Sequence, residues 1–444
     1  MLSAPTATSS SSSSTTPILA GMRVVEAAAF VAAPLGGMTL AQMGADVIRI
    51  DALGGGLDYR RWPVTDDGVS LFWCGLNKGK RSVALDLASP QGRELAMALI
   101  TAPGDDAGLF ITNFPPRGWL AYEGLSAKRP DLIQMTLQGD RHGGSAVDYT
   151  VNARLGVPLI TGPNTGSGAG EGDSGEGIDD GEGTDGVKGI DANTAAVVNH
   201  VLPAWDLVTG QMIATGLLAA ERHRRRTGVG QHVKLALEDM GLAVMGHLGF
   251  IAEAQLGQER GRHGNELFGA FGRDFVCADG ERVMVVGLTL KQWRSICAAT
   301  GLGEAVAALG ARLGLDLDQE GNRFIARVAL AELVGGWIAA HPFAQVQRAF
   351  DAKAVCWGRY QTLRTLVRDD PACSEANPLF RNVEQPGVGS YLVPGLPLDF
   401  SAVPRSAPKP APRLGEHTEE VLASLLGMSS GEYGRLRDGK VVGG

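Results

Sequence analysis

Hydrophobic positions in the first half of the chain follow two spacings that alternate in a regular order. Short apolar runs that predict β-strands are separated by segments with the 3.6-residue spacing of helices. Because parallel strands need such crossover helices, the order predicts a doubly wound α/β core. The expected strands are MRVVEAAA, DVIRID, RSVALDL, AGLFITNF, DLIQMTLQG and QHVKLAL, and the first expected helices are GGMTLAQMGA and PQGRELAMALIT.

The pattern changes beyond the last of these strands. EDMGLAVMGHLGFIAEAQL predicts one long helix that leads out of the core. FVCADGERVMVVGL then predicts a hairpin that turns at Asp279-Gly280, and amphipathic helices follow it. We therefore expect a second, smaller α+β domain. A proline-rich linker leads from it to a final helix, EHTEEVLASLLG, with Thr418 in range to cap the first turn.

Two segments have almost nothing to bury, and we predict that both are disordered. One is the Ser/Thr-rich tail at 1–17. The other is an insertion at 164–195 whose eight acids and one lysine give a net charge of −7, out of −8 for the whole chain. The predicted organisation is a large α/β domain at 18–245, the small domain at 250–365, and a linker with a C-terminal segment at 366–444 that returns to the large domain.

Composition excludes several classes of protein. Outside the acidic insertion the net charge is only −1, so we expect no nucleic-acid partner. We expect no membrane association, because no apolar run reaches the ~18 residues of a membrane span, and no secretory signal precedes the core. The five cysteines are far apart and contain no C-x-x-C, which favours a cytoplasmic location. His142, His200 and His263 are isolated, so no metal site is predicted.

Asp206 is the most informative polar residue. A strand-like run from Val197 ends at this aspartate, and a helix of about five turns with a basic last turn follows. Asp206 is suited to be the N-cap residue of this helix, with its side chain accepting hydrogen bonds from the backbone N–H groups of residues 208 and 209. It also fits a nucleophile, because the positive end of a helix favours the carboxylate form, which needs no base to activate it. The two interpretations are compatible.

Other candidate positions each have a simpler alternative. LNKGKRS at 76–82 offers three cations to a phosphate, or is a solvated turn. Asn113-Phe114 lies where open α/β sheets bind ligands, or is an ordinary turn. Asp148 either starts a helix or is a buried carboxylate that lines a pocket. The loop at 262–272 either covers a pocket or only connects two elements.

The loop after the first strand, VAAPLGG, lacks the G-x-G-x-x-G spacing, so it does not indicate NAD binding. A phosphate-bearing ligand on its backbone amides remains compatible with the helix N-terminus that follows.

Taken in order, these segments resemble the family III CoA-transferases, from about Ile18 to the C-terminus. The resemblance implies a Rossmann-like large domain, a smaller α+β domain and an interlocked homodimer that binds an acyl-CoA substrate. The segments that carry it are FVAAP, LAQMGADVIRID, LNKGKRSVALDL, the Asn-Phe pair, VDYTVNARLG, RRTGVGQHV and LGEHTEEVL.

The resemblance also assigns roles. It makes Asp206 the catalytic nucleophile. It places CoA-binding residues at Val31, Ala32, Leu85, Asp86, Asn113, Phe114 and Asp148. Three positions depart from the family pattern: a lysine is replaced by Ala88, an arginine after the second strand by Ala52, and another arginine near the Asn-Phe turn is replaced around Tyr122. Charge for the CoA phosphates must then come from other cations, of which Lys80 is one, beside Arg60, Arg61, Lys78 and Arg117.

The finer detail narrows the activity. Racemases of this superfamily carry a histidine where this chain has Val147, and its loss argues against α-proton exchange. AVDYTVN, NHVLPAWD and FGAFGRDF resemble most a branch that moves CoA between the two carboxyl groups of one methylfumarate, through an aspartyl-CoA thioester. A CoA-transferase acting between two separate acids, and a non-catalytic acyl-CoA-binding protein, remain as alternatives. We expect no cofactor beyond the CoA moiety of the substrate.

Overall fold

The computed structural model describes residues 16–163, 197–258 and 260–444. They form two compact units. Unit 1 takes the described parts of Met1–Leu155, Val201–Phe250 and Asp369–Gly444, and unit 2 takes those of Gly156–His200 and Ile251–Arg368. The predicted acidic insertion and nearly all of the predicted tail lie outside the described residues.

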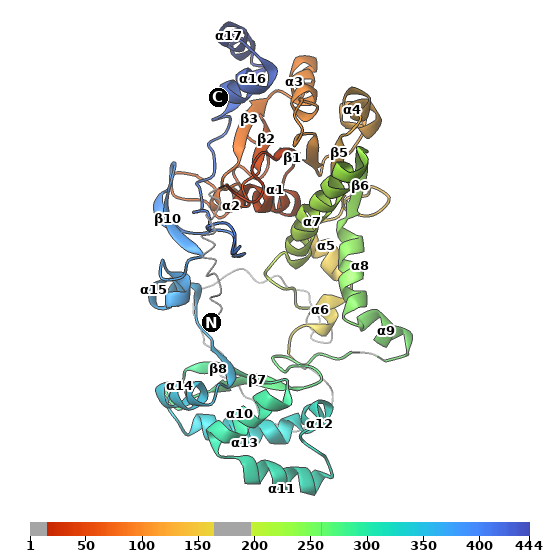
Figure 1. Cartoon of the computed structure of the whole chain (residues 1–444). Coiled ribbons are helices and arrows are strands. Elements are labelled where there is room, and N and C mark those ends of the chain that lie inside the picture. Colours follow the sequence, from red (N-terminus) through yellow and green to blue (C-terminus); the bar gives the residue numbers. More distant parts are fainter. Residues whose placement is uncertain (1–15, 164–196, 259) are drawn as a thin grey trace, which may run out of the picture. The chain divides into compact units, whose positions relative to one another are not determined.

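Unit 1 is built on a seven-stranded sheet (Figure 1). Six parallel strands lie in the order β3-β2-β1-β4-β5-β6, and the short β12 pairs antiparallel with β3. This is the Rossmann order, whose topological switch point lies between β1 and β4. All six strands predicted for the core are confirmed. The strands are β1 (Arg23–Ala27), β2 (Asp46–Ala52), β3 (Arg81–Leu85), β4 (Leu109–Thr112), β5 (Ile133–Gln138), β6 (Gln231–Ala236) and β12 (Val442–Gly443).

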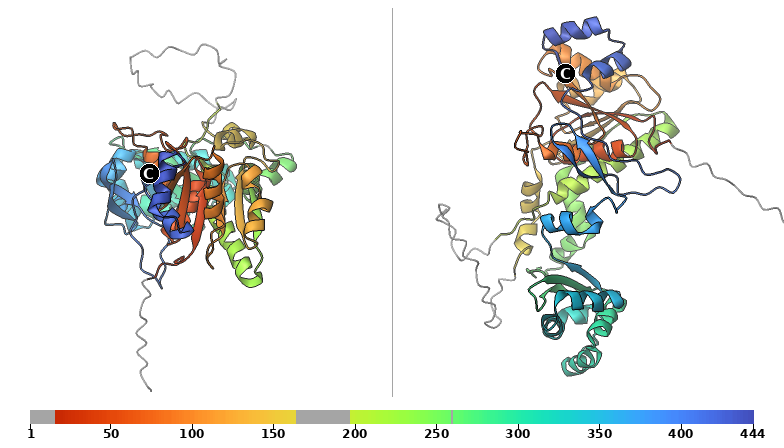
Figure 2. Two further views of the ribbon diagram at one scale, coloured as in Figure 1. Left: turned by 90° about the horizontal axis from the view of Figure 1, so that it is seen from above. Right: turned by 90° about the vertical axis from the view of Figure 1, so that its left-hand side faces the viewer.

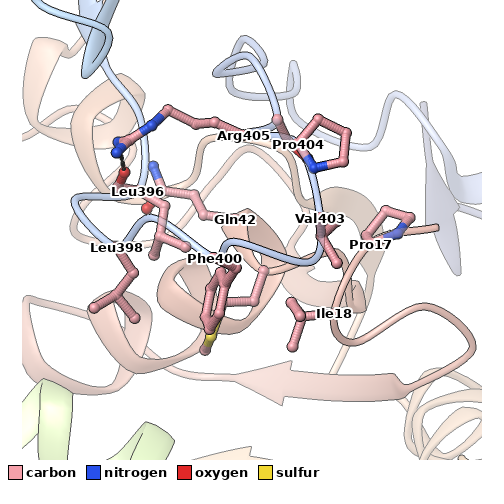
Figure 3. A pocket seen from close by; sticks show the side chains of 11 residues that line it. Pro17, Ile18, Gln42, Leu396, Leu398, Phe400, Val403, Pro404 and Arg405 are labelled. Carbon is pink, nitrogen blue, oxygen red and sulfur yellow. Dashed lines mark hydrogen bonds between the residues drawn. The ribbon is translucent and has the colours of Figure 1, made fainter. Parts of the chain in front are cut away.

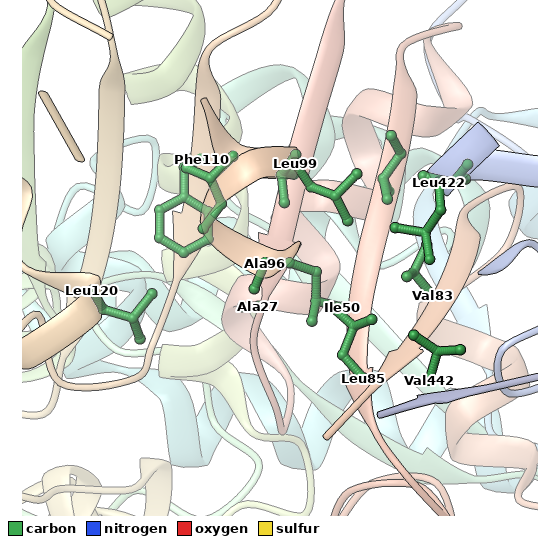
Figure 4. Close-up of a cluster of buried hydrophobic side chains, with 14 of the residues drawn as sticks. Ala27, Ile50, Val83, Leu85, Ala96, Leu99, Phe110, Leu120, Leu422 and Val442 are labelled. Carbon is green, nitrogen blue, oxygen red and sulfur yellow. The ribbon is translucent and has the colours of Figure 1, made fainter. Parts of the chain in front are cut away.

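Helices cover both faces of this sheet (Figure 2). On one face lie α1 (Ala32–Gln42) and α7 (Ala204–Thr227), and on the other lie α3 (Pro90–Ile100), α4 (Tyr122–Lys128) and α16 (Thr418–Leu426). Because strand side chains alternate between faces, one set of apolar residues meets α3 and α16. Figure 4 shows this core, which includes Ala27, Ile50, Val83, Leu85, Ala96, Leu99, Phe110, Leu120, Leu422 and Val442.

The start of α16 differs from the sequence prediction. Thr418, expected to cap α16, does not do so: His417 is the N-cap residue. The Thr418 hydroxyl instead donates to the Gly415 carbonyl and accepts from the Ala84 amide, which ties the helix to β3.

The other elements of unit 1 are α2 (Leu71–Leu76), a 3-10 turn (Gly118–Leu120), α5 (Asp148–Arg154), α8 (Leu237–His247), a second 3-10 turn (Pro371–Cys373), β10 (Phe380–Gln385), β11 (Gly389–Pro394) and α17 (Ser430–Asp438).

Unit 2 is an α+β body. The predicted hairpin is confirmed: β7 (Phe271–Val276) and β8 (Arg282–Gly287) pair antiparallel around Gly280, and β9 (Cys356–Arg359) joins them. The long helix expected after β6 is broken at Gly249, whose positive φ of 81° ends α8 before α9 (Phe250–Gln255) begins. The other helices are α6 (Val157–Ile160), α10 (Leu290–Thr300), α11 (Gly303–Leu313), α12 (Glu320–Ile325), α13 (Arg327–Ala339), α14 (Phe343–Ala352) and α15 (Leu363–Asp369).

Helices α1 and α7 touch backbone to backbone. A Cβ added at Gly210 would lie 2.9 Å from the Ala32 carbonyl oxygen and 2.8 Å from Leu35, and one added at Gly36 would lie 2.6 Å from Ile213. Glycine is therefore required at this crossing, since any side chain would force the helices apart. Because residues four apart share a face of a helix, Asp206 lies one turn before Gly210 on the side that faces the start of α1.

Gly210→Ala should lower the free energy of unfolding by roughly 1–3 kcal/mol, because the new methyl group overpacks a fixed backbone contact. Chemical denaturation of the whole chain measures this. Gly124→Ala in α4 is the matched control, since its methyl would meet no atom within 4 Å and is expected to be neutral or slightly stabilising. Equal stability of the two variants would contradict the close crossing.

Candidate active site

Asp206 lies inside the first turn of α7. The helix begins at Ala204, so the aspartate is its third residue, and Pro203 is the N-cap residue. The strand expected before Asp206 is wrong: residues 197–203 form no strand, and Val201 is 88% exposed. The predicted N-cap role is wrong as well. The physical reason is Pro203, which lacks an N–H for a strand ladder but suits the start of a helix.

The cap of α7 comes from a second carboxylate, Asp148. One oxygen, Oδ2, accepts the backbone N–H of Trp205 at 2.7 Å and that of Asp206 at 3.0 Å. Asp148 is only 2% exposed and is also the first residue of α5. Asp148 therefore starts one helix, which confirms the first alternative, and its buried carboxylate caps another; that it lines a pocket stays a prediction.

This arrangement sets the charge of Asp206. Burial raises the pKa of the Asp206 carboxyl to about 7, the negative charge of Asp148 adds to the increase, and Arg61 opposes it. The sequence predicted the opposite, a carboxylate favoured by the positive end of the helix. That expectation is wrong chiefly because the Asp206 carboxyl is buried, and also because Asp148 places a like charge beside it while accepting two of the first-turn amides.

Asn113 holds the loop at the switch point of the sheet. Its side-chain oxygen accepts the Ala29 amide at 3.1 Å, and its side-chain nitrogen donates to the Ala29 carbonyl at 2.8 Å. The loop after β1 is thereby fastened to the end of β4. Val31 is the N-cap residue of α1 and Ala32 begins it, both buried. Because the first amides of a helix have no acceptor within it, this helix start can receive an anionic oxygen.

All of these groups lie at one edge of the sheet. Phe30, Asn113 and Asp148 come after the carboxyl ends of β1, β4 and β5, and Arg61 comes after that of β2. Helix α7 leads into the parallel strand β6, so its first turn starts at the same edge. Ligands of open α/β sheets bind at this edge, beside the switch point.

Lys80 is buried in the interior of unit 1, so its ammonium is not exposed to receive the phosphate for which it was a candidate. Its ammonium is buried and donates to both Glu26 oxygens at 2.8 and 2.9 Å, to the Pro34 carbonyl and to Asn77. Glu26 is itself paired with Arg49, which also binds Asp51 and Asp58. Lys80 is therefore part of a buried ion network under α1, and its charge is already neutralised.

The other residues expected to contact CoA differ in burial and in the contacts they make. The side chain of Leu85 is in the hydrophobic core, and its backbone pairs with Ala52 and Val442. Asp86 accepts the Ala88 amide at 3.0 Å in the turn before α3. Phe114 is half-buried against the core. Of the proposed phosphate cations, Lys78 is also buried, while the others are exposed, namely Arg60, Arg61 and Arg117.

The hollows found in the described part of unit 1 lie away from Asp206. Figure 3 shows the one between Ile18 and the segment 396–406; it measures about 20 Å³, room for about one water molecule. A second lies between α3 and α17, and a third at the amino ends of β4, β5 and β6, opposite the edge that carries Asp206. The loop at 262–272 belongs to unit 2.

Three further features bear on the class of protein. Among the described residues, no group of three or more His, Cys, Asp or Glu side chains is placed to hold a metal ion. None of the helices in the described ranges is both long enough and apolar enough to cross a membrane. All five cysteines are free thiols.

The sequence and the fold match a known family. The family model for CoA-transferase family III matches residues 19–418, and this chain belongs to that family. The crystal structure of a CAIB/BAIF family protein from Brucella suis has the same fold, with a TM-score of 0.69 at 24% identity, over 92% of this chain and all of that one.

Curated relatives are more specific. The chain is 59% identical over 429 residues to the 2-methylfumaryl-CoA isomerase of Chloroflexus aurantiacus, covering 96% of this chain and 98% of that protein. It is 29% identical to the succinate–glutarate CoA-transferase of Agrobacterium fabrum, covering 92% of this chain and 96% of that protein. It is 27% identical to the succinyl-CoA:mesaconate CoA-transferase of Haloarcula hispanica, with 90% and 94% coverage.

The raised pKa of Asp206 should make the stability of the protein depend on pH. The pKa of this carboxyl is near 4 in the unfolded state and about 7 in the folded state, so its contribution to stability is fully present below about pH 4. That contribution is lost as the pH rises through about 7. Asp206→Asn lacks that titration. We expect its stability relative to the unmodified protein to rise by roughly 1–3 kcal/mol between pH 5 and pH 8.

Isothermal chemical denaturation at several pH values measures this difference. Glu123→Gln is the control, because Glu123 is an exposed acid in the first turn of α4. A difference between Asp206→Asn and the unmodified protein that does not change with pH would contradict the buried, raised carboxyl.

Proposed function

We propose that this protein moves CoA between the two carboxyl groups of one methylfumarate, converting 2-methylfumaryl-CoA into 3-methylfumaryl-CoA. The observation that carries the proposal is the 59% identity to a 2-methylfumaryl-CoA isomerase over 96% of the chain. The position of Asp206 supports it, because a carboxyl at the ligand edge of a Rossmann-like sheet is suited to covalent catalysis.

In the first half of the proposed reaction, an oxygen of the Asp206 carboxylate attacks the C1 thioester carbonyl of the substrate. The C–S bond breaks, CoA leaves as a thiolate, and a mixed anhydride joins Asp206 to the acyl group. The thiolate then attacks the aspartyl carbonyl. The bond between that carbonyl and the anhydride oxygen breaks, which releases the dicarboxylate and leaves an Asp206–CoA thioester.

The second half repeats these steps from the other end of the same acid. The C4 carboxylate attacks the aspartyl thioester and CoA again leaves as a thiolate. That thiolate attacks the new C4 acyl carbonyl of the anhydride, which yields the product and restores the Asp206 carboxylate. No proton is gained or lost overall. Retaining the acid beside Asp206 replaces a second encounter with proximity.

The charge state of Asp206 suits this chemistry. A carboxylate with a pKa of about 7 is a stronger base and nucleophile than an ordinary one, and much of it is still ionised at neutral pH. Each step passes through a tetrahedral oxyanion. The first amides of α1 lie at the same edge of the sheet, and we assign them to stabilise these oxyanions.

The proposal includes a setting for the reaction. The enzyme works as a homodimer in the cytoplasm, and two interlocked copies complete the CoA site. The chemistry calls for no cofactor beyond the CoA carried by the substrate, since every bond that forms or breaks involves Asp206, an acyl group or the CoA sulfur.

Incubation of the protein with 2-methylfumaryl-CoA and excess ¹³C-labelled free methylfumarate tests the proposal. The expected product is 3-methylfumaryl-CoA without label, because the acid released from CoA never leaves the site. Asp206→Ala should lower the rate by roughly 10⁴-fold or more, as loss of a nucleophile does. Glu123→Gln should leave the rate unchanged. Mass spectrometry of the thioesters gives both results.

The alternatives predict other outcomes of that experiment. Labelled product would indicate a CoA-transferase that acts between separate acids. Binding without any conversion, in the unmodified protein and in Asp206→Ala alike, would indicate an acyl-CoA-binding protein.

Asp148→Asn separates the two roles of the capping carboxylate. The amide oxygen of asparagine can still accept the Trp205 and Asp206 amides, but the negative charge beside Asp206 is gone. The acid limb of the kcat/KM profile, expected near pH 7, should therefore move to lower pH, with the thermal midpoint nearly unchanged. An acid limb that stays in place would show that the Asp148 charge does not govern Asp206.

A further inference from the structure

Arg61 is an exposed cation at the same edge of the sheet as Asp206. It follows the carboxyl end of β2, in the segment before α2, and its positive charge lowers the pKa of Asp206 against the effects of burial and Asp148. Arg61 forms no ion pair with any carboxylate of the described residues. It is therefore a guanidinium held near the site with its hydrogen-bonding edges available.

Two aromatic rings fix the position of this guanidinium. Its central carbon lies 5.1 Å from the centre of the Phe72 ring and 6.0 Å from that of Phe30. Stacking of a guanidinium on aromatic faces restrains the side chain and leaves its N–H groups directed outward in its own plane. The rings also make the surroundings apolar, which strengthens any charged hydrogen bond that Arg61 forms.

Phe30 has an unusual backbone conformation. Its φ of 69° lies in the left-handed region, which a residue with a side chain adopts at a cost, and its ring is 38% exposed. The neighbouring Ala29 is fixed on both its N–H and C=O groups by Asn113. The loop therefore holds the exposed Phe30 ring against Arg61. Both the left-handed backbone of Phe30 and the exposure of its apolar ring are unfavourable by themselves.

The backbone on the other side is fixed as well. The Arg61 carbonyl accepts the Ser70 hydroxyl at 2.5 Å, and the Arg61 amide donates to the Asp58 carbonyl. Asp58 is buried and forms an ion pair with Arg49 at 2.9 Å, within the same network that contains Lys80. The segment that carries Arg61 is thus anchored in the interior of unit 1.

We propose that Arg61 binds the carboxylate of the acyl group that is not joined to CoA, and so selects dicarboxylic acyl-CoA substrates. The inference rests on the proposed function. A guanidinium matches a carboxylate with two parallel hydrogen bonds. A group bound next to the carbon that Asp206 attacks belongs to the acyl part of the substrate, because the phosphates of CoA lie at the far end of the pantetheine arm.

The role extends through the reaction. After the first transfer the released acid carries two carboxylates, and Arg61 holds one while the other faces the Asp206–CoA thioester. Exchange of the two ends on Arg61 then presents the C4 carboxylate for attack. Arg61 would in this way keep the free acid in the site during its reorientation.

Arg61→Met tests the proposal with two substrates. One is 2-methylfumaryl-CoA, and the other is the CoA thioester of 2-methylbut-2-enoic acid, in which a methyl group replaces the free carboxylate. The readout is the rate at which the Asp206–CoA thioester forms, trapped with hydroxylamine and measured by mass spectrometry. Loss of charged hydrogen bonds should slow the dicarboxylic substrate by roughly 10- to 100-fold and leave the methyl analogue unchanged.

Two controls accompany this variant. Arg61→Lys keeps the charge but loses the planar pair of donors, so an intermediate loss is expected. Arg222→Met removes an exposed arginine elsewhere on α7 and should change neither rate. Thermal midpoints close to that of the unmodified protein would show that each variant folds.

The outcomes separate the two proposals. An equal loss with both substrates would place Arg61 on the CoA part and overturn its role in substrate selection. An unchanged rate with the dicarboxylic substrate would overturn it too. Absence of an Asp206–CoA thioester in the unmodified protein, with either substrate, would instead count against the proposed function.

Discussion

The crossing of α1 and α7 is the constraint on which the rest of the site depends. Gly36 and Gly210 let the two helices meet at backbone distance, and this contact fixes the first turn of α7 against the loop that follows β1. Asp206 lies one turn from Gly210, so its position is set by packing in the body of unit 1. The proposed nucleophile therefore needs no loop movement to reach its orientation.

A second carboxylate then affects the charge of Asp206. Asp148 accepts the amides that would otherwise stabilise a charged Asp206, and it adds a like charge beside it. The helix start keeps its hydrogen bonds, and the reactive carboxyl keeps a pKa near neutrality. Arg61 lowers the pKa of Asp206, so the ionisation of Asp206 depends on a balance between its own burial and the charge of Asp148 on one side and the charge of Arg61 on the other. Binding of an anionic acyl group at Arg61 would shift that balance.

The fold was predictable from the sequence because its signals are local. Strand runs such as RVVEA and the alternation with helices fix a parallel sheet without any knowledge of long-range contacts. The helix that carries Asp206 was predicted for the same reason, whereas the strand expected before it is absent from the described residues. The cap of α7 was not predicted, because Asp148 and Trp205 are 57 residues apart and only the folded chain brings them together. The burial of Lys80 was not predicted either, although Glu26 and Arg49 in two apolar strands were a signal that buried charges needed partners.

The central claim is that Asp206 becomes covalently bonded to the acyl group through one of its own oxygens. The direct measurement uses 2-methylfumaryl-CoA labelled with ¹⁸O in its free carboxylate, followed by digestion and tandem mass spectrometry of the peptide that contains Asp206. In the mechanism described, the second half-reaction leaves one oxygen of that carboxylate on the aspartate. The account predicts ¹⁸O in Asp206 after turnover; conversion of substrate to product with an unlabelled Asp206 would contradict it.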